Sequence, residues 1–360
     1  MLNTSTYDPT PVAAPSVPPV QRLSEPLNLR AGEWVEVRSA DEIMATLDDR
    51  SCLEGMPFMQ EMLEFCGRRF RVYKSAHKTC DTIETYVIRR MSRAVHLEGL
   101  RCDGSGHGGC QAGCLLFWKD AWLKRVSDGP AAEAAESAPG DRPGRGSHAS
   151  AEHAAVLSAT ACLPPSEGDT RERYRCQATE VVRATTEVRR RDRWDPRFYV
   201  RDLTSGNVSI REFLWFGAIA VFNAFSLWLG GKRYPHLCGL AGPKTPTVNL
   251  GLKQGQLVQV RSKAEIMKTL NSGLRNRGLL YDYEMVPFCE NGPYPVKQVV
   301  EKIINEKTGH MMKLPNPCLI LDGVTCSGKL SASRMFCPRA VYPYWHEIWL
   351  KPTNESGSTS

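Results

Sequence analysis

Apolar and polar positions alternate where the folded part of the chain begins. The run GEWVEVRS, residues 32–39, alternates in this way and predicts a short half-buried strand. Ser39 and Glu42 then form an S-x-x-E capping box, which predicts a short helix directly after the strand. Two further strand-like runs follow at residues 70–74 and 94–100. Several short strands broken by turns and one small helix predict a small β-barrel.

The same pattern returns in the second half of the chain. GQLVQVRSKAEIMKTLN, residues 255–271, matches GEWVEVRSADEIMATLD, residues 32–48, almost position by position. The match continues through the cysteines and tryptophans, pairing Cys66 with Cys289, Cys102 with Cys326, Cys110 with Cys337, Trp118 with Trp345, and Trp122 with Trp349. Similarity across a whole module predicts an internal duplication. The expected fold is therefore mainly β, with two tandem SH3-like barrels over residues 30–126 and 249–352. We expect the four later tryptophans to belong to the cores of these barrels.

The remaining segments are assigned from their composition and apolar periodicity. Three segments poor in large apolar residues predict a disordered tail at 1–29, a disordered linker at 127–170 and a disordered tail at 353–360. A helical connector is expected over residues 171–248, beginning with an amphipathic helix across 172–191.

A second connector helix is strongly apolar. Ser209 and Glu212 form its capping box, and the apolar run from Phe213 to Leu229 ends at two glycines. About 17 apolar residues is borderline for crossing a bilayer, and Asn223 and Ser226 interrupt the run. The helix is therefore expected to be buried, to face a partner, or to rest at a membrane surface.

Net charge and cysteine content bear on the partners, the location and the redox state of the cysteines. The chain has 360 residues and a formal net charge of +7, which permits an acidic partner or nucleic acid without requiring one. The N-terminus lacks the basic and apolar regions of a secretory signal, so we expect a cytoplasmic location, with membrane association as the alternative. In that compartment the 13 cysteines should be thiols or metal ligands rather than disulfides.

Four of these cysteines predict a metal site in the first repeat. Cys80, Cys102, Cys110 and Cys114 follow a C-x21-C-x7-C-x3-C pattern around a glycine-rich loop, with His107 and His77 as reserve ligands. Zinc prefers four soft ligands in a tetrahedron, so Zn²⁺ is the expected ion. The second repeat has Ile304 in place of Cys80 and Val341 in place of Cys114. Loss of two ligands on a retained scaffold would leave the second repeat without the metal.

Two other interpretations of the cysteines stay open. They could be reduced thiols buried in the core, where free cysteine is common. They could also form a redox-active or iron–sulfur site, because CDGSGH resembles the CDGSH signature of small iron–sulfur proteins. An inserted Gly106 and the absence of the paired upstream C-x-C separate this chain from that family.

Basic runs raise the possibility of nucleic-acid binding. They comprise Arg68, Arg69, Arg71, Lys74 and Lys78 in the first repeat, and Arg189, Arg190, Arg191 and Arg193 in the connector. Such residues can follow a phosphate backbone, although a solvated face is the usual reason for them. The sequence contains no nucleophile elbow, H-E-x-x-H or dinucleotide fingerprint, so it leaves open whether the protein is an enzyme.

The layout resembles a family of bacterial proteins in which a helical connector joins two SH3-like barrel repeats and the first repeat has a cysteine-rich loop. The resemblance rests on VEVRS, EIMATLD, PFMQEMLEFCGRRFRVYKSAHKTCD, RCDGSGHGGCQAGCLLFWKDAWL, WDPRFYVRDLTSGNVS, NRGLLYDYEMVPFC and FCPRAVYPYWHEIWL. It implies a fold and a domain layout rather than an activity. Since SH3-like barrels bind peptides in aromatic grooves, we expect a non-catalytic binding or assembly protein with a structural zinc. A redox or metal-dependent enzyme is the second hypothesis and a nucleic-acid-binding module the third.

Overall fold

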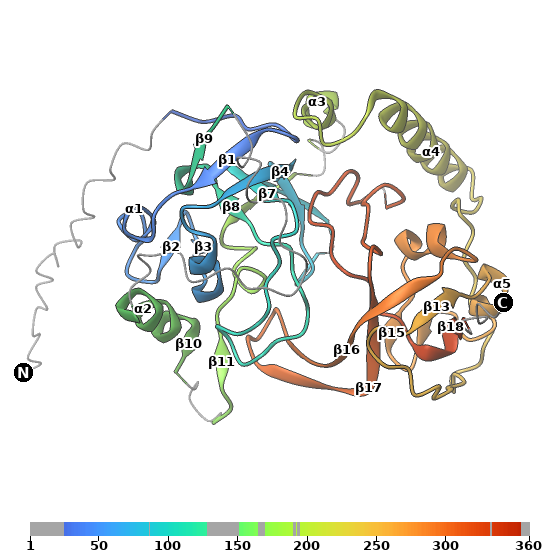
Figure 1. Cartoon of the computed structure of the whole chain (residues 1–360). Coiled ribbons are helices and arrows are strands. Elements are labelled where there is room, and N and C mark those ends of the chain that lie inside the picture. The colour runs from blue at the N-terminus through green and yellow to red at the C-terminus, as the bar shows by residue number, and fades with distance from the viewer. Residues whose placement is uncertain are drawn as a thin grey trace, which may run out of the picture.

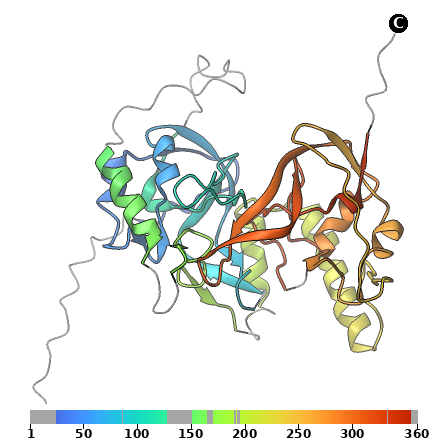
Figure 2. The same ribbon diagram turned by 90° about the horizontal axis from the view of Figure 1, so that it is seen from below.

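The computed structural model describes residues 25–85, 87–127, 151–164, 170–189, 192, 195–331 and 333–353. Figures 1 and 2 show two β-rich halves with the helical connector beside them. The described chain is built mainly from small antiparallel sheets with few helices, as the sequence predicts, and one sheet forms a half-barrel. The disorder predicted for residues 1–24, 128–150 and 354–360 lies outside the described residues.

The first half contains a five-stranded antiparallel sheet in the order β8-β7-β4-β1-β9. Its strands are β1 (Trp34–Val37), β4 (Arg69–Ser75), β7 (Ala94–Leu97), β8 (Trp118–Lys119) and β9 (Leu123–Arg125). A three-stranded sheet adds β5 (Lys78–Cys80), β6 (Ile88–Met91) and β12 (Thr185–Glu187), and a hairpin joins β2 (Cys52–Leu53) to β3 (Met56–Pro57). Strand β1 lies between β4 and β9, and its alternating burial matches the alternating sequence pattern.

The second half contains a four-stranded sheet in the order β17-β16-β13-β18. Its strands are β13 (Leu257–Val260), β16 (Tyr294–Ile304), β17 (Met311–Leu321) and β18 (Leu350–Pro352), and a hairpin joins β14 (Arg275–Asn276) to β15 (Leu279–Leu280). The long β16–β17 hairpin extends to the first half (Figures 1 and 2). There the side chain of Gln111 accepts hydrogen bonds from the backbone N–H groups of Glu301 and Lys302 at 2.8 and 2.9 Å.

Corresponding short helices follow each other in the same order in both halves. They are α1 (Ala40–Met44) and α5 (Lys263–Met267), then the 3₁₀ helices η1 (Gln60–Phe65) and η5 (Tyr283–Phe288), then η2 (Asp120–Trp122) and η6 (Glu347–Trp349). The capping box predicted at Ser39 with Glu42 forms, and an equivalent box forms at Ser262 with Glu265 in the second half.

The tryptophans predicted to be core residues lie inside the two halves. Trp118, Trp122, Trp345 and Trp349 are fully buried. In the first half Phe58 packs edge-on against Trp122 at 5.2 Å, and in the second half Tyr281 packs in the same way against Trp349 at 5.4 Å. These contacts account for the burial by core packing, so the tryptophans are not available to stack on a ligand.

The connector differs from its prediction at its start. The helix expected across residues 172–191 is wrong: the described part of this segment, up to residue 189, forms β11 (Arg173–Tyr174), a series of turns and β12. Its backbone pairs instead with β6 and with β10 (Cys162–Leu163), and Val181 is fully buried in the first core. Tertiary pairing therefore overrides the helical pattern. Part of the predicted disordered linker is helix α2 (Ala151–Ala161), because Leu157 and Ala161 bury themselves against the same core.

The later connector forms α3 (Pro196–Thr204) and α4 (Ile210–Trp228). The predicted apolar helix and its capping box of Ser209 and Glu212 are present. Helix α4 lies at the edge of the molecule (Figure 1), where Phe213 stacks on Phe336 at a ring distance of 5.7 Å. Within the part of the chain that the structure describes, α4 is long and apolar enough to cross a membrane, but length and composition alone are weak grounds for a span.

Candidate metal centre

The cysteine-rich loop is a closed turn that returns to its own start. The N–H of Cys102 donates to the carbonyl of Cys114 at 2.8 Å, and the N–H of Gly109 donates to the carbonyl of Gly104 at 2.9 Å. Gly104 has φ +77°, and a Cβ there would lie 2.2 Å from the Cys110 carbonyl oxygen, so glycine is required at this position. The loop geometry places His107 inside the molecule.

Three side chains with metal-binding atoms meet beneath this loop. The Cys102 Sγ lies 3.3 Å from Glu61 Oε1 and 3.4 Å from His107 Nε2, and His107 Nδ1 lies 3.5 Å from Glu61 Oε1. One donor atom from each of the three falls within 4.8 Å of the others. An ion takes only one of the two imidazole nitrogens, and a set of three donors within this limit could hold a single metal ion.

The triad is buried and incompletely hydrogen-bonded. His107 is 1% exposed and Glu61 is 7% exposed. Glu61 Oε2 and His107 Nδ1 have no hydrogen-bond partner among the described residues, and the Nδ1 contact with Glu61 is an approach without bonding geometry. Unsatisfied polar atoms in the interior cost free energy that a bound ion would recover.

Burial also shifts the titration of the three groups. It raises the pKa of the Glu61 carboxyl and of the Cys102 thiol, and it lowers the pKa of His107 to about 4. In the absence of an ion the histidine is therefore neutral, while the acid and the thiol resist ionisation. A divalent cation reverses this preference for Glu61 and Cys102, because it stabilises carboxylate and thiolate directly.

A small cavity of about 30 Å³ adjoins the triad. Besides the triad, its lining includes the thiols of Cys110, Cys114 and Cys176 and the carboxylate of Glu306. A cavity of this size holds one or two water-sized particles, which is enough for an ion or a water and too small for an organic substrate. These thiols and this carboxylate are the candidates for a fourth ligand.

The structure does not gather the four predicted cysteine ligands. Cys102, Cys110 and Cys114 line the same cavity, whereas Cys80 lies on β5 and its backbone N–H donates to the Sγ of Cys337 at 3.2 Å. Strand β5 belongs to the three-stranded sheet, which carries Cys80 away from the loop and into a separate cluster with Cys337. A tetrahedral four-cysteine site is therefore absent from the described residues, and a Glu-Cys-His group stands near its predicted place.

The two reserve ligands have different positions. His107 joins the triad. His77 lies next to β5, and its Nε2 faces the Oδ1 of Asp202 at 3.3 Å. His77 therefore belongs to a different polar cluster.

Glu61 is the ligand that the cysteine pattern missed. The repeat could have indicated it, because Glu61 in η1 corresponds to Glu284 in η5. Glu284 is 2% exposed, and its carboxylate is fully engaged by the adjoining loop. It accepts hydrogen bonds from the N–H groups of Leu330 and Ser331 at 2.6 and 2.9 Å and from the Ser327 hydroxyl at 2.7 Å.

The two equivalent carboxylates thus have different partners. In the second half, backbone N–H groups of the loop donate hydrogen bonds to Glu284. In the first half, the loop places a thiol and an imidazole beside Glu61 instead. Gly106 allows the loop to pass close by, since a Cβ there would lie 2.5 Å from Glu61 Oε2. The first loop is therefore shaped around Glu61 but leaves one of its oxygens unpaired.

The basic run of the first half does not form one free surface. Arg69 pairs with Glu36 at 3.1 Å, Arg71 donates to the carbonyl of Gly32 at 3.0 Å, and Lys78 is fully buried against Asp202 at 2.5 Å. Of the basic connector run, Arg190, Arg191 and Arg193 lie outside the described residues.

Comparison with known proteins adds no relative. No protein-family model matches the chain, and neither a curated protein nor a solved structure shows significant similarity to it.

Proposed function

We propose that this protein is a non-catalytic binding and assembly protein whose first half is stabilised by one Zn²⁺ held by Glu61, Cys102 and His107. The observation that supports this is the contrast between two equivalent carboxylates. Glu284 has hydrogen-bond donors on both oxygens, while Glu61 faces a thiol and an imidazole and keeps one oxygen unpaired. A bound cation would give the Glu61 carboxylate the partner that hydrogen-bond donors give to Glu284.

The donor set favours zinc with a structural role. Carboxylate oxygen, thiolate sulfur and imidazole nitrogen are all common zinc ligands. Structural zinc sites are closed by a fourth ligand, and the cavity offers Cys110, Cys114 and Cys176 for that position. A substrate could not enter, because the cavity is about 30 Å³ and His107 is buried.

The proposal extends to the architecture. The shared order of strands, capping boxes and 3₁₀ helices supports two SH3-like barrels that arose by duplication. In such a molecule the metal would fix the loop of the first barrel, while hydrogen bonds to Glu284 fix the loop of the second. A cytoplasmic location belongs to the same proposal.

The binding role is supported by helix α4. Its large apolar side chains that are more than half exposed are Ile210, Leu214, Trp215, Val221, Phe222, Phe225, Trp228 and Leu227. A contiguous apolar face of this kind marks an interaction site. Exposed Arg211 lies in the first turn of the helix and exposed Lys232 follows its end, and an apolar helix with basic residues at its ends and with tryptophans suits an anionic membrane surface.

The polar residues of α4 are consistent with that placement. Asn223 is buried and exchanges hydrogen bonds with the backbone of Tyr234, at 2.8 Å to its carbonyl and 2.7 Å from its N–H. The chain after the helix therefore folds back along it. This arrangement favours a helix that lies in the interface over one that spans the bilayer.

Metal content tests the central claim. Protein purified without oxygen should contain about one zinc per chain and no colour. Glu61→Gln should lose most of the metal, while the matched Glu284→Gln should retain it. Iron with visible charge-transfer bands would favour the redox alternative, and metal-free wild-type protein would contradict the proposal.

Vesicle flotation tests the role of α4. We expect binding to phosphatidylcholine vesicles that contain phosphatidylserine, and loss of binding in Phe222→Asp. Val200→Asp, a change on α3, is the control and should still float with the vesicles. Wild-type protein that stays with the unbound fraction would refute the membrane contact and leave the metal proposal untouched.

A further inference from the structure

A cleft of about 780 Å³ opens in the first half and shares no lining residue with the cavity of the metal centre. Its walls come from β6, from the turn before β12 and from the start of α3. This volume is in the range of small-molecule sites. Arginines dominate its lining, namely Arg90, Arg93, Arg183, Arg197 and Arg201.

Positive charge in this cleft is not balanced by its carboxylates. The two acidic residues of the lining, Glu54 and Asp195, already have partners. Glu54 accepts from Lys119 Nζ at 2.6 Å and from the Ser92 hydroxyl at 2.7 Å, and Asp195 caps α3. Arg197 and Arg201 stand four residues apart on one helix, where like charges repel each other. An anion between them would remove that repulsion.

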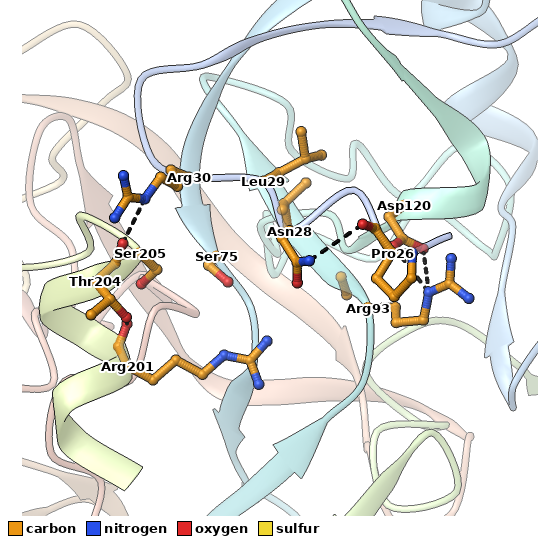
Figure 3. A pocket seen from close by; sticks show the side chains of 12 residues that line it. Pro26, Asn28, Leu29, Arg30, Ser75, Arg93, Asp120, Arg201, Thr204 and Ser205 are labelled. Atoms are coloured by element: carbon orange, nitrogen blue, oxygen red, sulfur yellow. Dashed lines mark hydrogen bonds and ion pairs between the residues drawn. The ribbon is translucent and has the colours of Figure 1, made fainter. Parts of the chain in front are cut away.

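Several of the arginines are free to bind. Arg90, Arg197 and Arg201 form no ion pair with any residue that the structure describes. The guanidinium of Arg90 lies over the Phe198 ring at 5.1 Å, which holds it at the cleft. An adjoining pocket of about 210 Å³ shares Arg93 and Arg201 with the cleft. In Figure 3, Arg201 extends from α3 into this pocket, whereas Arg93 turns toward Asp120.

A buried histidine lines the same cleft and gives a second indication of a ligand. His77 is 4% exposed, and its Nδ1 has no hydrogen-bond partner among the described residues. Behind it Asp202 is neutralised by the fully buried Lys78 at 2.5 Å. A buried polar atom without a partner beside an arginine-lined cleft is expected where a ligand completes the hydrogen bonding.

The distribution of charge indicates a compact ligand. On the neighbouring strands the basic side chains are paired locally, as in Arg69 with Glu36, Arg125 with Glu33 and Lys124 with Glu42. The arginines of the cleft line one hollow of limited volume, and such a hollow suits a compact ligand better than an extended polynucleotide.

We propose that this cleft binds a compact oligophosphate, a small molecule carrying two or more linked phosphate groups. Arg90, Arg197 and Arg201 hold its oxygens, since arginine forms paired charge-assisted hydrogen bonds with phosphate. The site is separate from the metal centre and does not depend on it.

Calorimetric titration of the full chain with inorganic triphosphate tests the proposal. We expect one site per chain and binding at least about tenfold tighter than that of orthophosphate, because more charge-assisted contacts form. Arg197→Gln and Arg201→Gln should each weaken triphosphate binding by about tenfold. The matched control is Arg125→Gln, an arginine paired with Glu33 outside the cleft, and it should bind like the wild type.

The remaining outcomes separate the alternatives. Adenosine triphosphate that binds as well as inorganic triphosphate shows recognition of the phosphate chain alone, and tighter binding shows that a nucleotide is the ligand; both support the site. Three results would overturn it: no triphosphate binding to folded wild-type protein at low salt, equal weakening in Arg125→Gln, or tighter binding of a single-stranded oligonucleotide that Arg197→Gln leaves unchanged. Circular dichroism melts of each variant establish that a loss of binding is not a loss of folding.

Discussion

The backbone N–H of Cys80 donates a hydrogen bond to the Sγ of Cys337 across 3.2 Å, although 257 residues separate them in the chain. Both side chains are buried, and hydrogen bonding between the two raises the pKa of the Cys80 thiol. Cys80 comes from the first half and Cys337 from the second. The contact therefore joins the halves and gives Cys80 a packing role rather than a place at the metal centre.

This placement predicts that substitutions at Cys102 change the metal content, whereas substitutions at Cys80 and Cys337 leave the metal in place. Cys80→Ala should retain the metal, and Cys102→Ala should lose most of it, since only Cys102 stands with Glu61 and His107. Cys337→Val should lower the free energy of unfolding by about 1–2 kcal/mol, because the buried Cys80 N–H loses its acceptor. Metal analysis and urea denaturation measure the two effects. Equal metal loss in Cys80→Ala and Cys102→Ala would restore Cys80 as a ligand.

Gly106 provides a milder test of the metal centre. A Cβ at this position would stand 2.5 Å from Glu61 Oε2, so Gly106→Ala must displace that carboxylate from its present position. We expect zinc affinity to fall by about tenfold while the protein remains folded, because displacing one ligand weakens the binding of the ion without unfolding the loop. Competition with a zinc chelator measures the change.

Gly242→Ala is the matched control for that variant. A Cβ at Gly242 would meet no atom within 4 Å, and the residue lies far along the chain from the loop. It should leave zinc affinity at the wild-type value. A similar loss of zinc in both variants would mean that the effect does not come from Glu61.

The elements that local signals determine could be predicted from the sequence. The capping boxes at Ser39, Ser209 and Ser262 start their helices where the S-x-x-E spacing places them. Strand β1 shows the alternating burial of its sequence pattern. In each case the deciding contacts lie within a few residues, so the sequence contains them directly.

Features that depend on distant partners were not predictable in the same way. Helix α2 forms because Leu157 reaches a core assembled by other segments. The segment after residue 171 forms strands because β6 and β10 are there to pair with it. The replacement of Cys80 by Ile304 in the second repeat suggested that Cys80 was a ligand, but β5 leads it to Cys337. The cysteine pattern did not predict Glu61 as a ligand, because a single buried carboxylate has no spacing pattern of its own.

Two of the four buried tryptophans, Trp122 and Trp349, donate indole hydrogen bonds whose removal should destabilise the protein by similar amounts. Trp122 Nε1 donates to Thr46 Oγ1 at 3.1 Å, and Trp349 Nε1 donates to Thr269 Oγ1 at 2.9 Å. Thr46→Val and Thr269→Val should each cost about 1–3 kcal/mol, because a buried N–H is left without an acceptor. Thermal melts measure the losses. Thr247→Val, at an exposed position, is the control, and a loss as large in that variant would contradict the role of the indole bonds.

The last prediction concerns the pH dependence of stability at His96. This ring is fully buried, its Nδ1 lies 2.8 Å from the carbonyl oxygen of Leu116, and burial lowers its pKa to about 3. The unfolded chain takes up a proton below its ordinary pKa of about 6.5, whereas the folded chain does not until about pH 3. Stability is therefore lost as the pH falls from 6.5 towards 3, at about 1.4 kcal/mol per pH unit from this residue.

His96→Gln removes that contribution while an amide N–H can still donate to Leu116. Between pH 7 and pH 5 the wild type should lose about 2 kcal/mol more unfolding free energy than the variant, and subtracting the two curves cancels the other buried histidines. Urea denaturation at a series of pH values measures this difference. Parallel curves for the two proteins would show that His96 takes up its proton equally in the folded and unfolded states, and hence that the burial of its ring does not hold it neutral.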